Sequence, residues 1–258
     1  MNLHKKELSL AIRNPQIIPY IPSKRKAICK LVELEISRAQ KNWKEIVSQG
    51  QSLEEVIRLS KVHWTFQQSA LYHVCRFLKP KLAVETGVDY GASSALILQA
   101  LEDNGDGSLY SIDLPQVEYE DPFKQKFKDL ALPKRSGTGF VVRSATRHRW
   151  NLILGDAKIE LPRLLSEIGA IDFFFHDSMH TYDHMMFEYQ TAFPFLKSGG
   201  IIASDDTTWN SSFDDFCNRY NLEMIKCYAK GFAMVKHPET DSSILTSCKS
   251  FKSLGNEN

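Results

Sequence analysis

Three aspartates at the ends of two apolar runs are the residues whose types and spacing most directly suggest chemistry. Asp177 ends the run "IDFFFHD", and the pair Asp205 and Asp206 ends the run "IIASDD". Consecutive strand residues point to opposite faces, so this pair can serve one ion only if the strand has ended before it. Carboxylates are hard oxygen donors that suit Mg²⁺ or another divalent cation. We therefore predict a metal site with Asp177, Asp205 and Asp206 as ligands.

Simpler interpretations of this region stay open. The acidic pair could cap a helix that begins near Asn210, because aspartate is common at helix N-termini. His176, His180 and His184 recur at intervals of four, but they cross a strand end, a loop and a helix start, so the helical spacing of zinc ligands does not apply. We expect no zinc site, and we expect His176 to be a hydrogen-bonded structural histidine.

A glycine turn, "VETGVDYGASS", follows the first strand-like run and precedes a helical pattern. Open parallel sheets bind ligands at such a turn. A dinucleotide-binding turn reads G-x-G-x-x-G, and counted from Gly87 its second glycine position holds Asp89, whose carboxylate would repel a pyrophosphate. The turn also lacks the GK[ST] ending of a P-loop. It therefore favours a ligand without a polyphosphate and argues against a nicotinamide oxidoreductase.

Three acids stand at the ends of three successive strand-like runs: Glu85, Asp113 and Asp156. A carboxylate at the second strand end is well placed to accept hydrogen bonds from ribose hydroxyls. S-adenosylmethionine offers an ammonium group, a ribose and no phosphate, so it fits this pattern, with Asp156 accepting from the adenine amino group. Any one of these acids could instead be a plain helix N-cap.

The elements that must position these residues alternate between strand and helix from residue 81 onward. Strands are expected in "KLAVET", "SLYSIDLP", "NLILGD", "IDFFFHD" and "IIASDD", with helices in "ASSALILQALED", "AKIELPRLLSEIG" and "TYDHMMFEYQTAFPFLKSGG" between them. This alternation predicts an α/β fold with a doubly wound, mostly parallel sheet. Two further runs, "LEMIKCYAK" and "FAMVKHP", have the spacing of a hairpin and predict an antiparallel strand at the C-terminal edge.

The first 79 residues read as helical. Ser52 and Glu55 have the spacing of a capping box, and Pro80 stops a helical pattern that contains Phe66 and Phe77. We predict an N-terminal helical extension over residues 1–79, a ligand-binding domain over 80–240 and a tail over 241–258. The extension also offers a surface on which a homo-oligomer could form.

Between the second and third strands lies a long insertion, residues 114–149. Insertions of this length are functional or locally structured. Its basic residues could receive an anionic substrate, but we favour a solvated basic face, because charge runs on surface segments usually have no further role: Lys134, Arg135, Arg143, Arg147 and Arg149. Trp209, just after the acidic pair, could stack on a sugar or another ring.

Composition limits the partners. Lys and Arg total 32 against 31 for Asp and Glu, so the chain has no overall field for nucleic acid or an anionic membrane. The five cysteines form no C-x-x-C pair, and no secretory signal or membrane-spanning apolar run is present. We expect a cytoplasmic protein that binds small molecules, with no nucleic acid and no membrane among its partners.

The ordered motifs resemble a known family. The run E-x-G-x-x-x-G-x-S, the aspartate after the second strand, "GDA", "FFFHDSMHTYDHMMFE" and "LKSGGIIASDD" are similar to class I S-adenosylmethionine-dependent methyltransferases, especially the metal-dependent branch with macrolide sugar O-methyltransferases. The resemblance covers residues 80–236 and implies a Rossmann-like, seven-stranded sheet. It implies cofactor contacts from Glu85, Gly87, Gly91, Ser93, Asp113, Asp156 and Asp177. Asp89 departs from the family pattern, which often has a third glycine there.

The resemblance also implies roles at the acidic cluster. Relatives hold their ion on an aspartate after the fourth strand and an acidic pair after the fifth, and sugar-modifying members use a histidine three residues after the first ligand as base. Asp177 and His180 are therefore the expected catalytic residues, and the acceptor is expected to be a small hydroxylated molecule, such as a sugar. A non-catalytic S-adenosylmethionine-binding protein and a metal-dependent oxygenase on the same fold are the alternatives.

Overall fold

The computed structural model of the chain describes residues 22–49, 52–60, 69–114, 137–227 and 231–239. Their centre is a seven-stranded sheet in the order β3-β2-β1-β4-β5-β7-β6. The strands are β1 (Leu82–Thr86), β2 (Ser108–Asp113), β3 (Trp150–Leu154), β4 (Ile171–His176), β5 (Leu196–Ser204), β6 (Met224–Cys227) and β7 (Phe232–Lys236). The predicted α/β architecture with a seven-stranded, mostly parallel sheet is confirmed.

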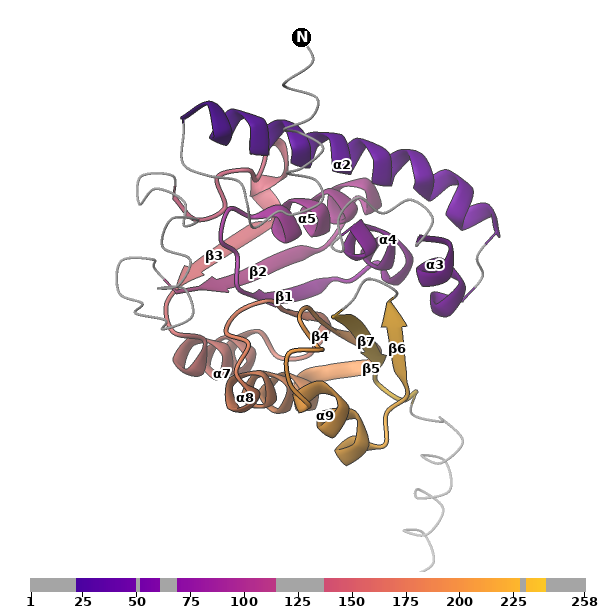
Figure 1. Cartoon of the computed structure of the whole chain (residues 1–258), viewed down its shortest axis with the longest axis vertical. Coiled ribbons are helices and arrows are strands. Elements are labelled where there is room, and N and C mark those ends of the chain that lie inside the picture. The colour runs from indigo at the N-terminus through magenta and orange to yellow at the C-terminus, as the bar shows by residue number, and fades with distance from the viewer. Residues whose placement is uncertain (1–21, 50–51, 61–68, 115–136, 228–230, 240–258) are drawn as a thin grey trace, which may run out of the picture.

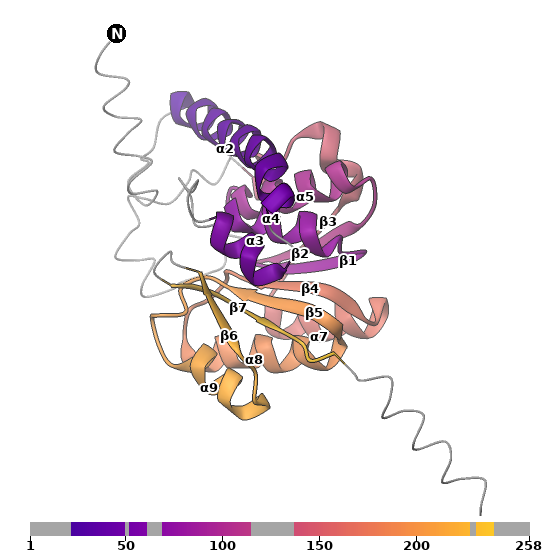
Figure 2. The same cartoon turned by 90° about the vertical axis from the view of Figure 1, so that its right-hand side faces the viewer.

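Helices cover both faces of the sheet (Figures 1 and 2). One face carries α2 (Pro22–Gln49), α3 (Leu53–Ser60), α4 (Ser69–Leu78) and α5 (Ala92–Asn104), and the other carries α7 (Ala157–Ile168), α8 (Tyr182–Ala192) and α9 (Ser212–Tyr220). Two short 3₁₀ helices, η4 (Ser144–Arg149) and η5 (Phe193–Phe195), precede β3 and β5. Among the described helices, none is both long and apolar enough to cross a bilayer.

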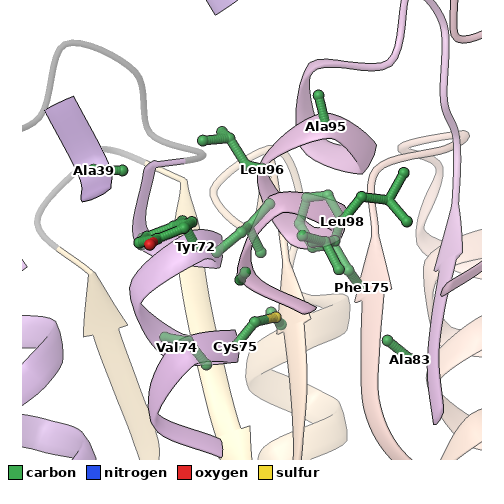
Figure 3. Packing of buried hydrophobic residues seen from close by; sticks show 14 of the residues in the cluster. Ala39, Tyr72, Val74, Cys75, Ala83, Ala95, Leu96, Leu98 and Phe175 are labelled. Atoms are coloured by element: carbon green, nitrogen blue, oxygen red, sulfur yellow. The ribbon is translucent and has the colours of Figure 1, made fainter. Parts of the chain in front are cut away.

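The apolar run of β4 shows why the sheet needs helices on both sides. Phe173 and Phe175 belong to the core beneath α4 and α5, whereas Phe174 belongs to the core against α7, α8 and α9. Figure 3 shows Leu98 of α5 beside Phe175. Alternating strand residues point to opposite faces, so a strand that is apolar throughout must be buried on both.

The N-terminal helices share the core of the sheet. Buried residues of α2, α3 and α4 lie in one hydrophobic cluster with α5 and with β1, β4 and β5. The predicted capping box at the start of α3 is confirmed, because the Ser52 N–H donates to Glu55 at 3.0 Å and the Glu55 N–H donates to the Ser52 hydroxyl at 3.2 Å. The proposed domain boundaries at residues 79 and 240 stay a prediction; residues 1–21 and 240–258 lie outside the described part.

The C-terminal hairpin differs in one respect from the expectation. β7 is antiparallel, as predicted, but it lies between β5 and β6 and pairs with both. The strand at the edge of the sheet is therefore β6. Hairpin spacing predicts that two strands pair, but it does not determine which of them inserts next to the parallel sheet.

Candidate functional site

The glycine turn lies between β1 and α5, where the order of the sheet reverses from β2 to β4. Gly87 has a φ of 84°, and a Cβ atom there would lie 1.9 Å from the backbone oxygen of Asp177. Gly91 has a φ of 93°, and a Cβ atom there would lie 2.8 Å from the Cα of Gly139. Both positions combine a left-handed backbone with a close backbone neighbour, which only glycine accommodates. The predicted cofactor turn is therefore in direct contact with the loop between β4 and α8, residues 177–181. This loop carries the expected catalytic residues Asp177 and His180 and is called the catalytic loop below.

Asp89 occupies the position where the resembled family often has a third glycine. Its φ of 47° places it in the left-handed region, which aspartate tolerates better than most residues. Its backbone oxygen accepts the N–H of Gly139 at 2.8 Å, and the Tyr90 oxygen accepts the N–H of Val141 at 3.1 Å. The end of the insertion is thus fastened to the cofactor turn, and the side chain of Asp89 is exposed.

Glu85 lies beneath the turn and is fully buried. Its carboxylate accepts hydrogen bonds from Ser111 at 2.6 Å, from Ser93 at 3.1 Å and from Ser94. Burial raises the pKa of Glu85 to about 7, although the three serine hydroxyls oppose the shift. The carboxylate of Glu85 and the hydroxyl of Ser93 are thus hydrogen-bonded to each other. Contact of either residue with the cofactor stays a prediction.

The raised pKa of Glu85 predicts a pH-dependent stability. The folded state binds this proton more tightly than the unfolded state, whose pKa is near 4.5, so the stabilisation is complete below that value and is lost as the pH rises through 7. Between pH 5 and 8 the free energy of unfolding should fall by about 2 to 3 kcal/mol through this group. Glu85→Gln should reduce the slope measured by urea denaturation by this amount, whereas Glu167→Gln, at an exposed site on α7, should leave the slope unchanged. Equal slopes in the parent and Glu85→Gln would contradict the assignment.

Asp113 and Asp156 stand at the ends of β2 and β3. The Asp113 carboxylate accepts the N–H of Val88 at 3.1 Å and the hydroxyl of Thr138 at 3.2 Å, so it lies against the glycine turn. Asp156 is exposed and accepts the N–H of Lys158 at 2.8 Å, which confirms the alternative of a helix N-cap for this residue. Cofactor contacts from either aspartate stay predictions.

The predicted catalytic and metal residues gather at the ends of β4 and β5. β5 ends at Ser204, so Asp205 and Asp206 lie beyond the strand, as one shared ion would require. Burial and the nearby charges of Asp205 and Asp206 raise the pKa of Asp177 well above its ordinary value. Burial and Asp206 raise the pKa of Asp205 to about 7. The charges of Asp205 and Asp206 thus oppose ionisation of Asp177, and the charge of Asp206 opposes ionisation of Asp205.

The arrangement does not form a ready metal site. In the described ranges, no group of three or more His, Cys, Asp or Glu side chains has the placement to hold a metal ion. The His180 Nε2 atom lies 3.7 Å from a carboxylate oxygen of Asp177 and 3.8 Å from one of Asp206, so the ring stands between these two acids. Asp205 also accepts the N–H of Asp206 at 2.9 Å. The described residues therefore show no convergent metal-ligand geometry at these aspartates, and the metal site stays a prediction.

His180 is held from three sides. Its ring lies 5.4 Å from the His176 ring and 5.2 Å from the Trp209 ring, and its backbone oxygen accepts from Asn210 at 3.1 Å. Only 16% of the His180 side chain is exposed, whereas 46% of Trp209 is exposed. The acidic pair does not cap α9, because the N–H of Ser212 donates to Asn210. A half-exposed indole therefore stands beside the candidate base.

A buried carboxylate that the sequence patterns did not reveal lies behind this loop. Glu188 of α8 accepts hydrogen bonds from Thr86, His176, Ser178 and His184. His176 is thus hydrogen-bonded through Nδ1, as expected of a structural histidine, and both outer histidines of the 176–180–184 series hydrogen-bond to Glu188. The spacing of four between His184 and Glu188 on one helix was the available signal.

The structure describes three of the insertion's basic residues, Arg143, Arg147 and Arg149. Arg149 pairs with Glu102 at 2.7 Å and donates to the Gly107 oxygen at 3.2 Å, at the opposite end of β2 from Asp113. Arg147 lies over the Trp150 ring. Arg149 thus lies at the end of β2 away from the glycine turn, and a role for the insertion's basic residues in receiving an anionic substrate stays a prediction. Lys134 and Arg135 lie outside the described residues.

Comparisons with known proteins agree with this architecture. Residues 84–207 match the family model described as a methyltransferase domain. The O-methyltransferase NovP superposes with a TM-score of 0.53 at 16% identity, over 81% of this chain and 100% of that one. A Podospora anserina methyltransferase bound to S-adenosylhomocysteine (SAH) gives 0.48 at 15% identity over 87% and 99%, and CalS11, a TDP-rhamnose 3'-O-methyltransferase, gives 0.47 at 15% over 78% and 93%. No curated protein matches the sequence.

The matched family region begins in β1 and ends just after β5. It therefore contains the glycine turn, the ends of β2 and β3, and the loops with the acids and His180. The structural likeness to NovP, at its low identity, shows the shared fold. Residues 84–207 thus match a methyltransferase domain, and the chain has the fold of the O-methyltransferase NovP.

Proposed function

We propose that the protein transfers the methyl group of S-adenosylmethionine to a hydroxyl oxygen of a small acceptor. One observation carries this proposal: the glycine turn touches the loop with the candidate base, because a Cβ atom at Gly87 would overlap the backbone of Asp177. The methyl donor and the acceptor hydroxyl would thus meet at one rim of the sheet. Direct transfer from sulfonium to oxygen depends chiefly on such proximity and alignment.

In this proposal the turn from Gly87 to Gly91 and the ends of β2 and β3 bind the cofactor. Asp113 already lies against the turn, where it would accept from the ribose hydroxyls, and Asp156 lies at the next strand end. Glu85 and Ser93 would support the turn from below, and the backbone at Asp177 would close it. A pyrophosphate is disfavoured at this turn, because Asp89 stands at the second glycine position of the dinucleotide-binding pattern and its exposed carboxylate would repel a phosphate.

His180 is the proposed general base. An alcohol is a weak nucleophile until its proton is removed, and a positioned base is typically worth about 10²- to 10⁴-fold in rate. His180 lies between Asp177 and Asp206, which would stabilise the imidazolium that forms when the ring takes the proton. Asp177 would therefore assist catalysis through His180, and no step requires the carboxylate itself to take the proton.

Trp209 supports an acceptor with a flat apolar face. Its indole is 46% exposed although it lies against the candidate base, so a ring or the C–H face of a sugar could stack on it next to the reacting hydroxyl. The acceptor class we propose is a sugar or a natural product of similar shape. No comparison supports a non-catalytic binding protein or an oxygenase.

A divalent cation remains part of the proposal. The donors Asp177, Asp205 and Asp206 fit a hard cation chemically, and such an ion would relieve the repulsion that raises their pKa values. When bound, it would lower the pKa of an acceptor hydroxyl. At pH 7.5, millimolar Mg²⁺ should raise the Tm of the parent protein. The expected rise is about 2 to 4 °C for each kcal/mol by which binding of the ion stabilises the folded state. Asp205→Asn should abolish the shift, and a shift of equal size in both proteins would contradict the assignment.

The direct test is methyl transfer from S-adenosylmethionine to a panel of glycosides, phenols and simple alcohols, with and without Mg²⁺. We expect O-methyl products from ring-bearing hydroxyl acceptors and SAH in equal amount. Methylation at nitrogen or carbon in place of oxygen would contradict the proposed reaction while leaving the methyltransferase assignment intact.

A further inference from the structure

Glu188 is a buried carboxylate with an unusually complete set of partners. Its side chain is fully buried on α8. One carboxylate oxygen accepts from the Thr86 hydroxyl and from His176 Nδ1, both at 2.5 Å, and the other accepts from the Ser178 hydroxyl and from His184 Nε2, both at 2.8 Å. Each oxygen thus has two donors, and none of them is a backbone group of the helix itself.

The donors keep this carboxylate ionised. Burial alone would raise the pKa of Glu188, but the charges and hydrogen bonds of His176 and His184 outweigh burial and hold the pKa well below its ordinary value. An ionised carboxylate can only accept hydrogen bonds, so the bonded nitrogen of each histidine must carry a proton. The orientation of both rings is therefore fixed by one acid.

Three of the four donors stand next to a residue of the candidate site. Thr86 directly precedes Gly87 of the cofactor turn, and His176 and Ser178 flank Asp177 on its two sides. The fourth donor, His184, lies in the first turn of α8, where the loop with His180 ends. One carboxylate thus joins the end of β1, the end of β4, the catalytic loop and the helix after it.

Packing of α8 does not by itself require this acid. Met185, Tyr189 and Ala192 are buried and hold α8 against the sheet. Replacing buried ionic groups by apolar residues of similar volume is often neutral or stabilising in proteins. A carboxylate at this position, in contrast, hydrogen-bonds both to Thr86 before the glycine turn and to the residues on either side of Asp177. It therefore links these two site segments.

We propose that Glu188 is a positioning residue that sets the distance between the methyl donor on the β1 turn and the groups of the catalytic loop. It would touch neither cofactor nor acceptor. The inference rests on the proposed function only for the roles of Asp177 and His180. Because a misplacement of about 1 Å can cost about 10²-fold in rate, a small change at Glu188 should affect turnover more than binding.

The test compares Glu188→Gln with the parent by hydrogen exchange, measured by mass spectrometry with and without SAH. The amide can accept through its oxygen but presents N–H groups to two of the present donors. We expect peptides that cover residues 86–90 and 176–184 to exchange about tenfold faster in the variant, with the core of β5 unchanged. If Glu188→Gln does not fold, Glu188→Asp keeps the charge one methylene further from its donors and should show the same pattern.

Asp103→Asn is a matched control. Asp103 also joins several elements, because it accepts from Gln40 at 2.8 Å, from Tyr72 at 2.6 Å and from Gln99 at 2.9 Å. These donors lie on α2, α4 and α5, and none adjoins a residue of the candidate site. The control should therefore lower stability without changing exchange at residues 176–184.

Turnover gives the second readout. With an acceptor from the methyl-transfer panel, kcat of Glu188→Gln should fall about 10- to 100-fold while the KM for S-adenosylmethionine changes less than about threefold. Parent-like exchange in both site peptides, or a kcat no lower than that of Asp103→Asn, would overturn the inference. If the parent protein itself transferred no methyl group, the proposed function would fail, whereas the exchange comparison would still decide whether Glu188 joins the two segments.

Discussion

Gly87→Ala is expected to abolish binding of SAH and to destabilise the fold. The added Cβ would lie 1.9 Å from the backbone oxygen of Asp177, and the φ of 84° is unfavourable for alanine. Because the clashing atom is backbone, either the turn or the end of β4 must move. Left-handed strain and overpacking together should lower the free energy of unfolding by about 2 to 4 kcal/mol. Calorimetry should show at least about 100-fold weaker binding of SAH, because the turn that moves is the proposed binding surface.

Gly105→Ala separates the two causes. Gly105 has a φ of 78°, close to that of Gly87, but a Cβ atom there would meet nothing within 4 Å. It should therefore lose about 1 to 2 kcal/mol of stability from backbone strain alone and should bind SAH like the parent. Parent-like binding by Gly87→Ala, or equal loss of binding in both variants, would contradict the placement of the cofactor at this turn.

His180→Ala is expected to remove most of the turnover and little of the cofactor affinity. As the proposed base, the imidazole should contribute about 10²- to 10⁴-fold to the rate. His180 is not part of the Gly87–Gly91 turn and lies beside Trp209 and between two carboxylates, so the Kd for SAH should change less than about threefold. Initial rates with an accepted substrate, together with calorimetry on the same preparation, measure both quantities.

His148→Ala is the control for that experiment. His148 is exposed on η4 and pairs only weakly with Glu102 at 3.3 Å, at the opposite end of the sheet from His180. It should be active at the level of the parent. A rate for His180→Ala within threefold of the parent rate would exclude the histidine as the base.

Much of the fold could be predicted because its signals are local. The capping box at Ser52 and the strand-like run of three phenylalanines each determine an element through neighbours in sequence. The glycine turn could also be predicted from the sequence, because Gly87 and Gly91 stand where the backbone requires φ above zero. The position of β7 inside the sheet was not, because strand order depends on contacts between distant segments.

The site was predicted in its location more than in its detail. The sequence places acids at strand ends, and parallel strands bring those ends to one rim, so Asp113, Asp177 and Asp205 were expected near each other. Which way each side chain points depends on tertiary neighbours. Glu85 therefore engages three serines below the turn, and His180 stands between two of the expected metal ligands.

Glu188 shows the same difficulty more strongly. Its four donors come from β1, β4, the loop after β4 and α8 itself. The most distant donor in sequence, Thr86, lies 102 positions away. Nothing in the local pattern of α8 distinguishes it from a solvent-exposed glutamate, except the histidine four residues before it. Such networks become visible only once the packing of the helix on the sheet is known.

The measurement that tests the central claim most directly is calorimetric titration of the parent protein and of Asp113→Ala with SAH. Asp113 lies against the glycine turn, where it would bind the ribose. The account predicts a Kd of about 1 to 100 μM for the parent and at least tenfold weaker binding for the variant. Failure of the parent to bind SAH, or equal binding by both proteins, would contradict a cofactor site at the β1 turn and the end of β2.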